Sequence, residues 1–282
     1  MQQSKLFLSY IDTCFKKFHA GLEDYYSSGQ VKSLFKMRVT IKKLRACLKC
    51  IEYYHGEKKF KKARKQFKVI FMTGGNLREL KKYREWFKRH SLLRVAIMID
   101  LDKSISESEA EFEKLKSKIK HSMEEIKRLV TEYARKLSQE EVYKFYLALI
   151  EERLPLLSRQ TKKNQLHSFR KELKRILYAR HWQDEKGILI VSKRQAVFLD
   201  QFQHLIGSWH DNEEMGSWIR EQKIKHVGRR LTAEKKAAFE TAFKSIDETV
   251  ARLYQKLITK QKLCPAVMQP VRNRIAKARE EN

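Results

Sequence analysis

Positively charged side chains recur at helical spacing in the segment from residue 34 to residue 51. We call Arg38, Lys42, Arg45 and Lys49 the first basic row; Phe35 precedes it at the same spacing. Steps of three and four residues place these side chains on one side of a helix, about one turn apart. Like charges at this spacing repel one another, and an anionic partner would convert the repulsion into charge-assisted contacts. The row therefore predicts a binding site for an extended polyanion.

An apolar seam lies one position ahead of the first basic row. Its members are Leu34, Met37, Ile41, Leu44, Leu48 and Ile51. Their alternating three- and four-residue spacing is typical of a helix that packs in a bundle. Because one position corresponds to about 100° of rotation, the basic row should border the buried face.

The same pattern returns 132 positions further along the chain. The matching pairs are Arg38 with Arg170, Lys42 with Lys174, Lys43 with Arg175, Gly75 with Gly207, Glu79 with Asp211 and Trp86 with Trp218. Because the chain has only four Trp residues, a Trp match in register is unlikely to arise by chance. The chain is therefore predicted to contain two related halves, 1–138 and 139–282.

The second half carries its own seam and basic row. The seam consists of Leu166, Phe169, Leu173 and Ile176. The bordering line reads His167, Arg170, Lys174, Leu177 and His181, with Lys171 and Arg175 beside it. The second basic row, defined as His167, Arg170, Lys171, Lys174 and Arg175, is predicted to bind the same kind of anion.

Composition predicts an all-α protein, since helix breakers are few: three Pro and nine Gly in 282 residues. The expected helices are 4–26, 30–54, 57–72, 77–98, 104–136, 140–154, 161–182, 193–206, 211–224, 232–260 and 266–280. Turns are expected at Gly74-Gly75 and at 184–187. At Asp211 we expect a helix N-cap, and the Trp86 and Trp218 pair favours core positions over a stacking platform.

The formal net charge of +28 indicates an anionic partner: nucleic acid, an anionic membrane surface or a phosphate polymer. The window 36–89 holds 19 basic and four acidic residues, so much of the excess lies there. No apolar run is long enough to span a bilayer, and no secretory signal is seen. With four scattered cysteines, the cytosol is the expected compartment.

At these residues the sequence resembles the conserved histidine α-helical domain (CHAD) family. The family motif is His, two residues, Arg-Val, two residues, a basic pair, Leu and Arg. Residues 35–45 read Phe-Lys-Met-Arg-Val-Thr-Ile-Lys-Lys-Leu-Arg, and residues 167–177 read His-Ser-Phe-Arg-Lys-Glu-Leu-Lys-Arg-Ile-Leu. A later element, a Gly near an acidic residue, is similar to 75–79 and 207–211. Phe35 and Leu177 depart from the motif, at the histidine of the first copy and at a basic position of the second.

The resemblance implies one domain, 1–282, made of two pseudo-twofold-related four-helix bundles around a basic central groove. It also implies non-catalytic binding of inorganic polyphosphate, with targeting to polyphosphate granules or regulation of polyphosphate metabolism. The expected contacts are Arg38, Lys42, Lys43, Arg45, Lys49, Arg78, Lys82, His167, Arg170, Lys171, Lys174 and Arg175. No cofactor and no metal are expected.

Other readings remain open at this point. A helical nucleic-acid-binding protein has the same charge, although no recognised base-reading motif is present. A polyphosphate phosphatase or kinase would need a metal site, and few carboxylates lie near the rows. Cys47 and Cys50 form a Cys-x-x-Cys in mid-helix without a preceding strand or a second pair, which favours packing. His210 with Asp211 could act as a base with its orienting acid, but no partner nucleophile is evident.

Overall fold

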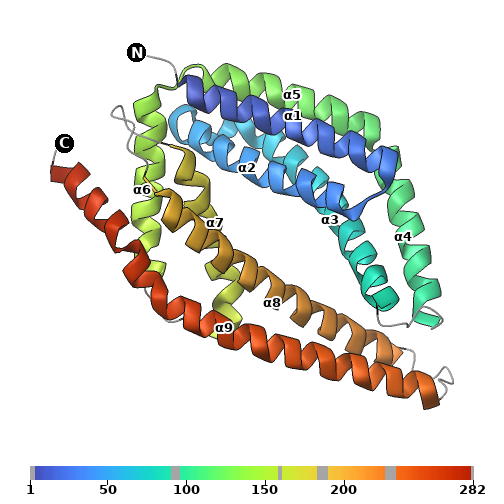
Figure 1. The fold of residues 1–282 in the computed structure, drawn as a ribbon. Coiled ribbons are helices and arrows are strands. Elements are labelled where there is room, and N and C mark those ends of the chain that lie inside the picture. Colours follow the sequence, from blue (N-terminus) through green and yellow to red (C-terminus); the bar gives the residue numbers. More distant parts are fainter. Residues whose placement is uncertain (1–3, 90–95, 158–160, 183–189, 226–232, 281–282) are drawn as a thin grey trace. The chain divides into compact units, whose positions relative to one another are not determined.

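The computed structural model describes residues 4–89, 96–157, 161–182, 190–225 and 233–280. These residues form nine α-helices and three short 3₁₀ helices, and they contain no β-strand (Figure 1). The predicted all-α class is confirmed. The chain divides into two compact units, Met1–Val142 and Tyr143–Asn282. The predicted turn at 184–187 lies outside the described residues.

The first unit is built around helix α2. Its helices are α1 (Lys5–Ser28), α2 (Val31–His55), α3 (Lys61–Arg89), α4 (Ala96–Lys114) and α5 (Lys116–Ala134). Helix α2 contacts α1, α3 and α5, and α1 lies beside α5 (Figure 1). The segment expected as one helix over 104–136 is broken at Leu115, which separates α4 from α5.

The predicted seam of α2 forms the core of the first unit. All six of its apolar residues, from Leu34 to Ile51, are buried. Helix α1 packs against α2, and its residues Phe15 and Phe18 have no exposed surface. The basic row is therefore held at the border of a packed interface, where the helix that carries it cannot rotate without breaking the core.

Local sequence signals set the helix ends. Ser4 caps α1 by accepting a hydrogen bond from the Phe7 amide at 3.2 Å. Gly29 ends α1 in the left-handed conformation with φ of 65°, which glycine adopts without steric cost. Ser138 and Glu141 exchange hydrogen bonds at 3.1 and 2.8 Å, forming a capping box at the start of α6.

The second unit contains the rest of α6 and three further helices. Helix α6 (Gln139–Leu157) begins in the first unit, and α7 (Leu166–Tyr178), α8 (Lys193–Lys225) and α9 (Ala233–Glu280) follow. Helix α8 contacts both α7 and α9. Short 3₁₀ helices, Lys163–Gln165 and Ala179–His181, flank α7. The predicted seam of α7, from Leu166 to Ile176, is buried.

The two helices predicted near the end of the chain, 232–260 and 266–280, were wrong in one respect, because the described residues there form a single helix, α9 (Ala233–Glu280). Pro265 and Pro270 lie inside it, and each removes one backbone donor from the helical ladder. The C-terminal third of α9 changes direction in Figure 1, as expected for a helix that accommodates proline by bending.

The predicted turn at Gly74-Gly75 was wrong, and so was the break near Gly207. Helix α3 runs through the first pair, and α8 runs through Gly207. Asp211 therefore lies in mid-helix and does not serve as an N-cap. Trp86 and Trp218 are half-buried and not core residues. Glycine lowers helix propensity. At Gly75 and Gly207, however, an arginine of the neighbouring helix occupies the space that a side chain would fill.

Candidate anion-binding site

The first basic row lies along α2 and faces cations from α3. Arg45 and Lys49 are exposed, whereas Arg38, Lys42 and the adjacent Lys43 are half-buried. The predicted α3 contacts, Arg78 and Lys82, are also half-buried. Because α2 packs directly against α3, residues far apart in sequence contribute positive charge to one surface of the first unit.

Arg38 is fixed at the contact between these two helices. Its Nη1 donates a hydrogen bond to the carbonyl oxygen of Phe71, and its guanidinium lies 3.9 Å from the centre of the Phe71 ring. Burial and the nearby charge of Arg78 lower the pKa of Arg38 to about 10, and Glu79 opposes this shift. The guanidinium stays charged at neutral pH; burial is the main cause of the depression, and the charge of Arg78 adds to it.

Phe71 and Phe35 hold cations over their ring faces. Lys42 Nζ lies 5.2 Å from the centre of the Phe71 ring, so this ring contacts two cations of the row. The guanidinium of Arg78 lies 5.5 Å from the centre of the Phe35 ring. The negative face of an aromatic ring stabilises a cation without neutralising it. No motif or spacing in the sequence pointed to Phe71. Its counterpart 132 positions on, Gln203, accepts the same kind of backbone hydrogen bond from Arg170.

The second basic row lies on α7 against α8. Arg170 donates from Nε to the carbonyl oxygen of Gln203 at 2.9 Å. His167 and Lys171 are exposed, and Lys174 is half-buried. The nearby Tyr178 hydroxyl has its pKa raised to about 12 by burial, with the charge of Arg170 acting in the opposite direction. Each half of the chain thus anchors one arginine of its row on the neighbouring helix.

Among the predicted contacts, Arg175 is bound by a carboxylate of its own helix. Its Nη1 lies 2.6 Å from Oε1 of Glu172, and the same carboxylate accepts from Arg153 at 3.0 Å. The Glu172 side chain is only 15% exposed. Its negative charge therefore offsets part of the positive charge of the second row.

His167 lies against His210, which the sequence analysis considered only as a base paired with Asp211. The rings of His167 and His210 have centres 4.7 Å apart, and Nε2 of His210 lies 3.2 Å from Oε1 of Glu214. His210 pairs with Glu214, one helical turn further along α8. The structure thus favours a role for His210 beside the second basic row over one as a base oriented by its neighbour Asp211.

These two rows lie within a recognised domain. The model of the CHAD domain family matches residues 9–220. The chain belongs to the CHAD family. The resemblance seen in the motifs is confirmed, and both basic rows fall inside the matched residues, whereas α9 lies beyond them.

A solved CHAD structure shares the fold. The crystal structure of the CHAD domain from the plant Ricinus communis gives a TM-score of 0.65 at 14% identity, covering 93% of this chain and 92% of that one. At this identity the likeness shows a common fold and nothing about ligands. Among curated proteins, no sequence matches the chain.

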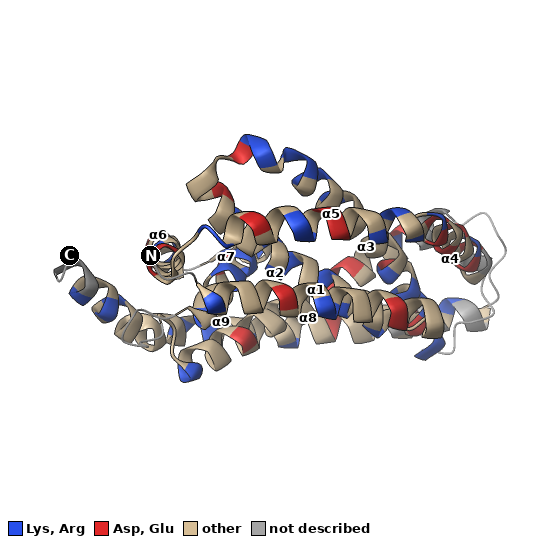
Figure 2. Ribbon diagram, turned by 90° about the horizontal axis from the view of Figure 1, so that it is seen from above, with Lys and Arg blue, Asp and Glu red and all other residues tan. Residues whose placement is uncertain are grey.

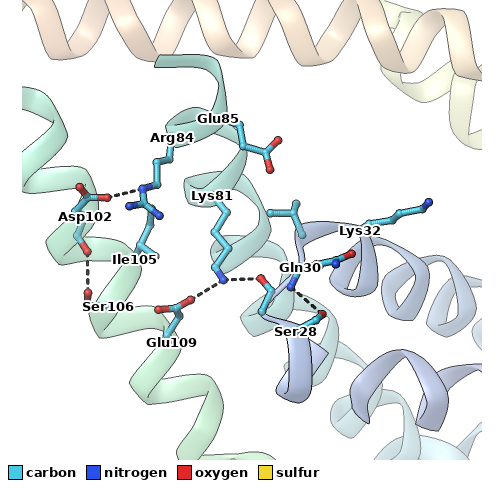
Figure 3. A pocket seen from close by; sticks show the side chains of 12 residues that line it. Ser28, Gln30, Lys32, Lys81, Arg84, Glu85, Asp102, Ile105, Ser106 and Glu109 are labelled. Atoms are coloured by element: carbon cyan, nitrogen blue, oxygen red, sulfur yellow. Dashed lines mark hydrogen bonds and ion pairs between the residues drawn. The ribbon is translucent and has the colours of Figure 1, made fainter. Parts of the chain in front are cut away.

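Charged residues of both signs line a cavity of about 820 Å³ at the α1–α2 turn of this CHAD chain, bounded by α3 and α4 (Figure 3). Lys81 lies 2.5 Å from Glu109 and donates to the Gly29 carbonyl oxygen at 2.9 Å. Arg84 Nε lies 2.8 Å from Asp102. Because its carboxylates balance these cations, the cavity is a weaker candidate for an anion than the basic rows.

Outside the two basic rows, helix α5 carries charges of both signs. Figure 2 shows acidic and basic residues interspersed along α5, which gives that helix little net charge.

The four cysteines are free and buried, and burial raises the pKa of the Cys50 thiol. Within the described ranges, no three His, Cys, Asp or Glu side chains gather as metal ligands would. None of the described helices is long and apolar enough to cross a bilayer.

Proposed function

We propose that this CHAD chain binds long-chain inorganic polyphosphate, without catalysing a reaction, through its two basic rows. The contacts are Arg38, Lys42, Lys43, Arg45, Lys49, Arg78 and Lys82 in the first half, and His167, Arg170, Lys171, Lys174 and Arg175 in the second. Both rows are continuous along a helix, which suits a polymer that carries a negative charge on each repeating unit.

The observation that carries the proposal is the gathering of cations at the α2–α3 contact, where Arg38 and Lys42 lie 3.9 and 5.2 Å from the centre of the same Phe71 ring and Arg78 is near enough to lower the pKa of Arg38. Burial and Arg78 both disfavour its charged form, so the free protein holds positive charge at this point against a cost. A phosphate chain along α2 would offset that cost with charge-assisted hydrogen bonds. The charge-balanced cavity beside α4 offers no such gain.

The identity of the polyanion rests on the family resemblance, and duplex DNA is the rival ligand. Bulk charge alone would attract both, and both would be released as salt concentration rises. The finer architecture implied by the resemblance, two related bundles about a basic groove, also remains a prediction, as do the single domain 1–282 and its halves 1–138 and 139–282. Residence in the cytoplasm, at polyphosphate granules, is part of the same proposal.

Calorimetric titration tests the proposal with three proteins: the wild type, an Arg38/Lys42/Arg45 triple alanine variant and a Lys58/Lys61/Lys68 triple alanine variant. The two variants lose the same charge, and the second loses it from exposed positions outside the rows. We expect the first variant to lose most polyphosphate affinity and the second to keep it.

Equal losses in the two variants would reduce the finding to bulk charge and overturn the assignment of the rows. Duplex DNA titrated in parallel decides between the ligands, because bound DNA that resists displacement by excess polyphosphate would favour a nucleic-acid function. Phosphate release from polyphosphate with Mg²⁺ present would contradict the non-catalytic part.

A further inference from the structure

The same contact occurs once in each half of the chain: an arginine side chain donates a hydrogen bond to a backbone carbonyl of the neighbouring helix, beside a glycine of that helix. In the first unit Arg38 donates to the carbonyl oxygen of Phe71, four residues before Gly75. In the second unit Arg170 donates to the carbonyl oxygen of Gln203, four residues before Gly207. In an α-helix the carbonyl of one residue points toward the residue four positions later. Each arginine therefore lies across the turn that ends at the glycine.

The glycine is what makes room for the guanidinium. A methyl group on the Cα of Gly75 would lie 2.8 Å from the central carbon of the Arg38 guanidinium and closer still to its Nη1. At Gly207 the same group would lie 2.6 Å from Nη2 of Arg170. Carbon atoms in contact normally stand about 3.5 Å or more apart, so any side chain at either position would push the arginine away from its carbonyl acceptor.

In the first unit, the fixed arginine also lies close to other cations. Arg38 shares the Phe71 ring with Lys42 and is close enough to Arg78 for their charges to interact. Its guanidinium thus lies between cations of α2 and α3, at the point where the two helices touch. Fixing this side chain fixes the spacing of the positive charges on either side of it.

We propose that Arg38 and Arg170 are positioning residues, each locked by a glycine (Gly75 or Gly207) and a helix carbonyl so that the neighbouring cations present a fixed spacing to an anionic chain. We call this arrangement, an arginine held by a helix carbonyl beside a glycine, the lock. It follows from the contacts and does not depend on the ligand. Its effect on anion affinity rests on the proposed function. Gly75 was predicted to lie in a turn and Gly207 between two helices. Each instead lies within a helix and leaves room for an arginine of the neighbouring helix.

A matched pair of substitutions tests the lock in the first unit. Gly74→Ala and Gly75→Ala alter adjacent positions of α3, change no charge and bring the same gain in helix propensity. At Gly74 the new methyl would lie 2.9 Å from the terminal carbon of Met37, the flexible end of a buried side chain, and 3.6 Å from the Phe112 ring, so this variant measures the cost of a methyl in the core without a clash with Arg38. At Gly75 it displaces Arg38. We expect Gly75→Ala to melt at a lower temperature than Gly74→Ala.

A double-mutant cycle identifies the cause of that difference. In an Arg38→Ala background the obstacle is gone, and Gly75→Ala should no longer lower the melting temperature. Arg170→Ala with Gly207→Ala gives an independent cycle in the second unit, which decides the matter if Arg38→Ala fails to fold. Additive effects in the cycles, or a Gly75→Ala variant that melts like Gly74→Ala, would overturn the lock.

The positioning role has its own readout, because Gly75→Ala keeps the net charge. We expect the affinity for long-chain polyphosphate to fall about tenfold, the value of one charge-assisted hydrogen bond, and the dependence of affinity on salt to become shallower. Gly74→Ala should leave both unchanged. A Gly75→Ala variant that binds like wild type would overturn the positioning role. If wild-type protein itself fails to bind, the proposed function and the positioning role fail together, and the melting cycles still decide whether the lock exists.

Discussion

The guanidinium of Arg78 lies over the exposed ring of Phe35, with 5.5 Å between its central carbon and the ring centre. Phe35 is 46% exposed, so its ring is accessible to solvent as well as to the guanidinium of Arg78. It occupies the place of the motif histidine, and the second half has His167 at the equivalent position. The two halves therefore offer an anion different groups at this point: an aromatic ring carrying a cation, and an imidazole.

Phe35→His should add a donor to the first basic row. An unperturbed histidine has a pKa of about 6.5, so the new imidazole would be charged below that pH and neutral above it. We expect polyphosphate to bind several-fold more tightly to the variant than to wild type at about pH 5.5, with the gain shrinking at about pH 8. Calorimetry at the two pH values measures this difference. Phe35→Leu controls for the lost ring, and a gain independent of pH would contradict the explanation.

The paired positions Arg45 and Leu177 should respond in opposite ways to exchange. Arg45 is exposed on α2, whereas Leu177 is only 7% exposed in the last turn of α7. Leu177→Arg would place a charge in the core and should lower the free energy of unfolding by about 2–4 kcal/mol. Arg45→Leu should change it by less than about 0.5 kcal/mol but weaken polyphosphate binding. Chemical denaturation and titration of both variants check this, and a well-folded Leu177→Arg variant that binds more tightly would refute it.

Within the second row, Lys171 and Arg175 should contribute unequally to binding. Arg175 is held by Glu172 at 2.6 Å, so its charge is partly offset before any ligand arrives, whereas Lys171 is exposed. Lys171→Ala should therefore reduce polyphosphate affinity more than Arg175→Ala. The second substitution should instead cost about 1 kcal/mol of stability, since it leaves the largely buried Glu172 with Arg153 alone. Titration and denaturation of the two variants compare the effects directly, and a larger loss of affinity in Arg175→Ala would contradict the argument.

Sequence periodicity predicted the helices and the seams because both depend on local spacing. The buried faces of α2 and α7 follow from apolar steps of three and four residues, and the 132-residue repeat identified the matching arginines. The role of Gly75 and Gly207 could not be predicted this way. Glycine favours a turn locally, and only the approach of Arg38 or Arg170 from another helix reveals why it is tolerated within one.

Ion pairs between residues far apart in the chain could not be predicted from the sequence either. Nothing in the spacing of α3 distinguishes Lys82, a predicted contact, from Lys81, whose charge is matched by Glu109 of α4. The neutralisation of Arg175 by Glu172 is a local three-residue step and could have been predicted from helical geometry. The participation of Arg153 in the same network required the fold.

Lys81 should act as a structural cation, and its removal should spare anion binding. Its side chain is 13% exposed, and it joins the end of α1 to α4 through the Gly29 carbonyl oxygen and Glu109. Lys81→Met should lower the free energy of unfolding by about 1–3 kcal/mol, because it leaves partners of a mostly buried charge without their donor. Lys88→Met, the same substitution at an exposed position of α3, should have little effect. Denaturation measures the stability, and a large loss of polyphosphate affinity in Lys81→Met would show that the cavity in Figure 3 takes part in binding.

Glu52 should make stability depend on pH in a direction opposite to that of most carboxylates. Its side chain is 7% exposed, and burial raises its pKa above the ordinary value of 4.5, although Arg64 at 3.2 Å opposes the shift. The folded state therefore holds this proton more tightly than the unfolded state. Between the ordinary and the raised pKa, folding binds a proton, so the contribution of Glu52 to stability is highest at low pH and declines as pH rises through that window.

Glu52→Gln removes this titration and keeps the shape of the side chain. The free energy of unfolding of the variant, relative to wild type, should therefore increase as pH is raised from about 4 to about 7. Urea denaturation at several pH values measures the difference, in which the titration of all other carboxylates cancels. Glu57→Gln is the matched control, because Glu57 is exposed and binds the same Arg64 at 3.0 Å. A change of equal size in both variants would show that the lost partner of Arg64, and not the burial of Glu52, sets the dependence on pH.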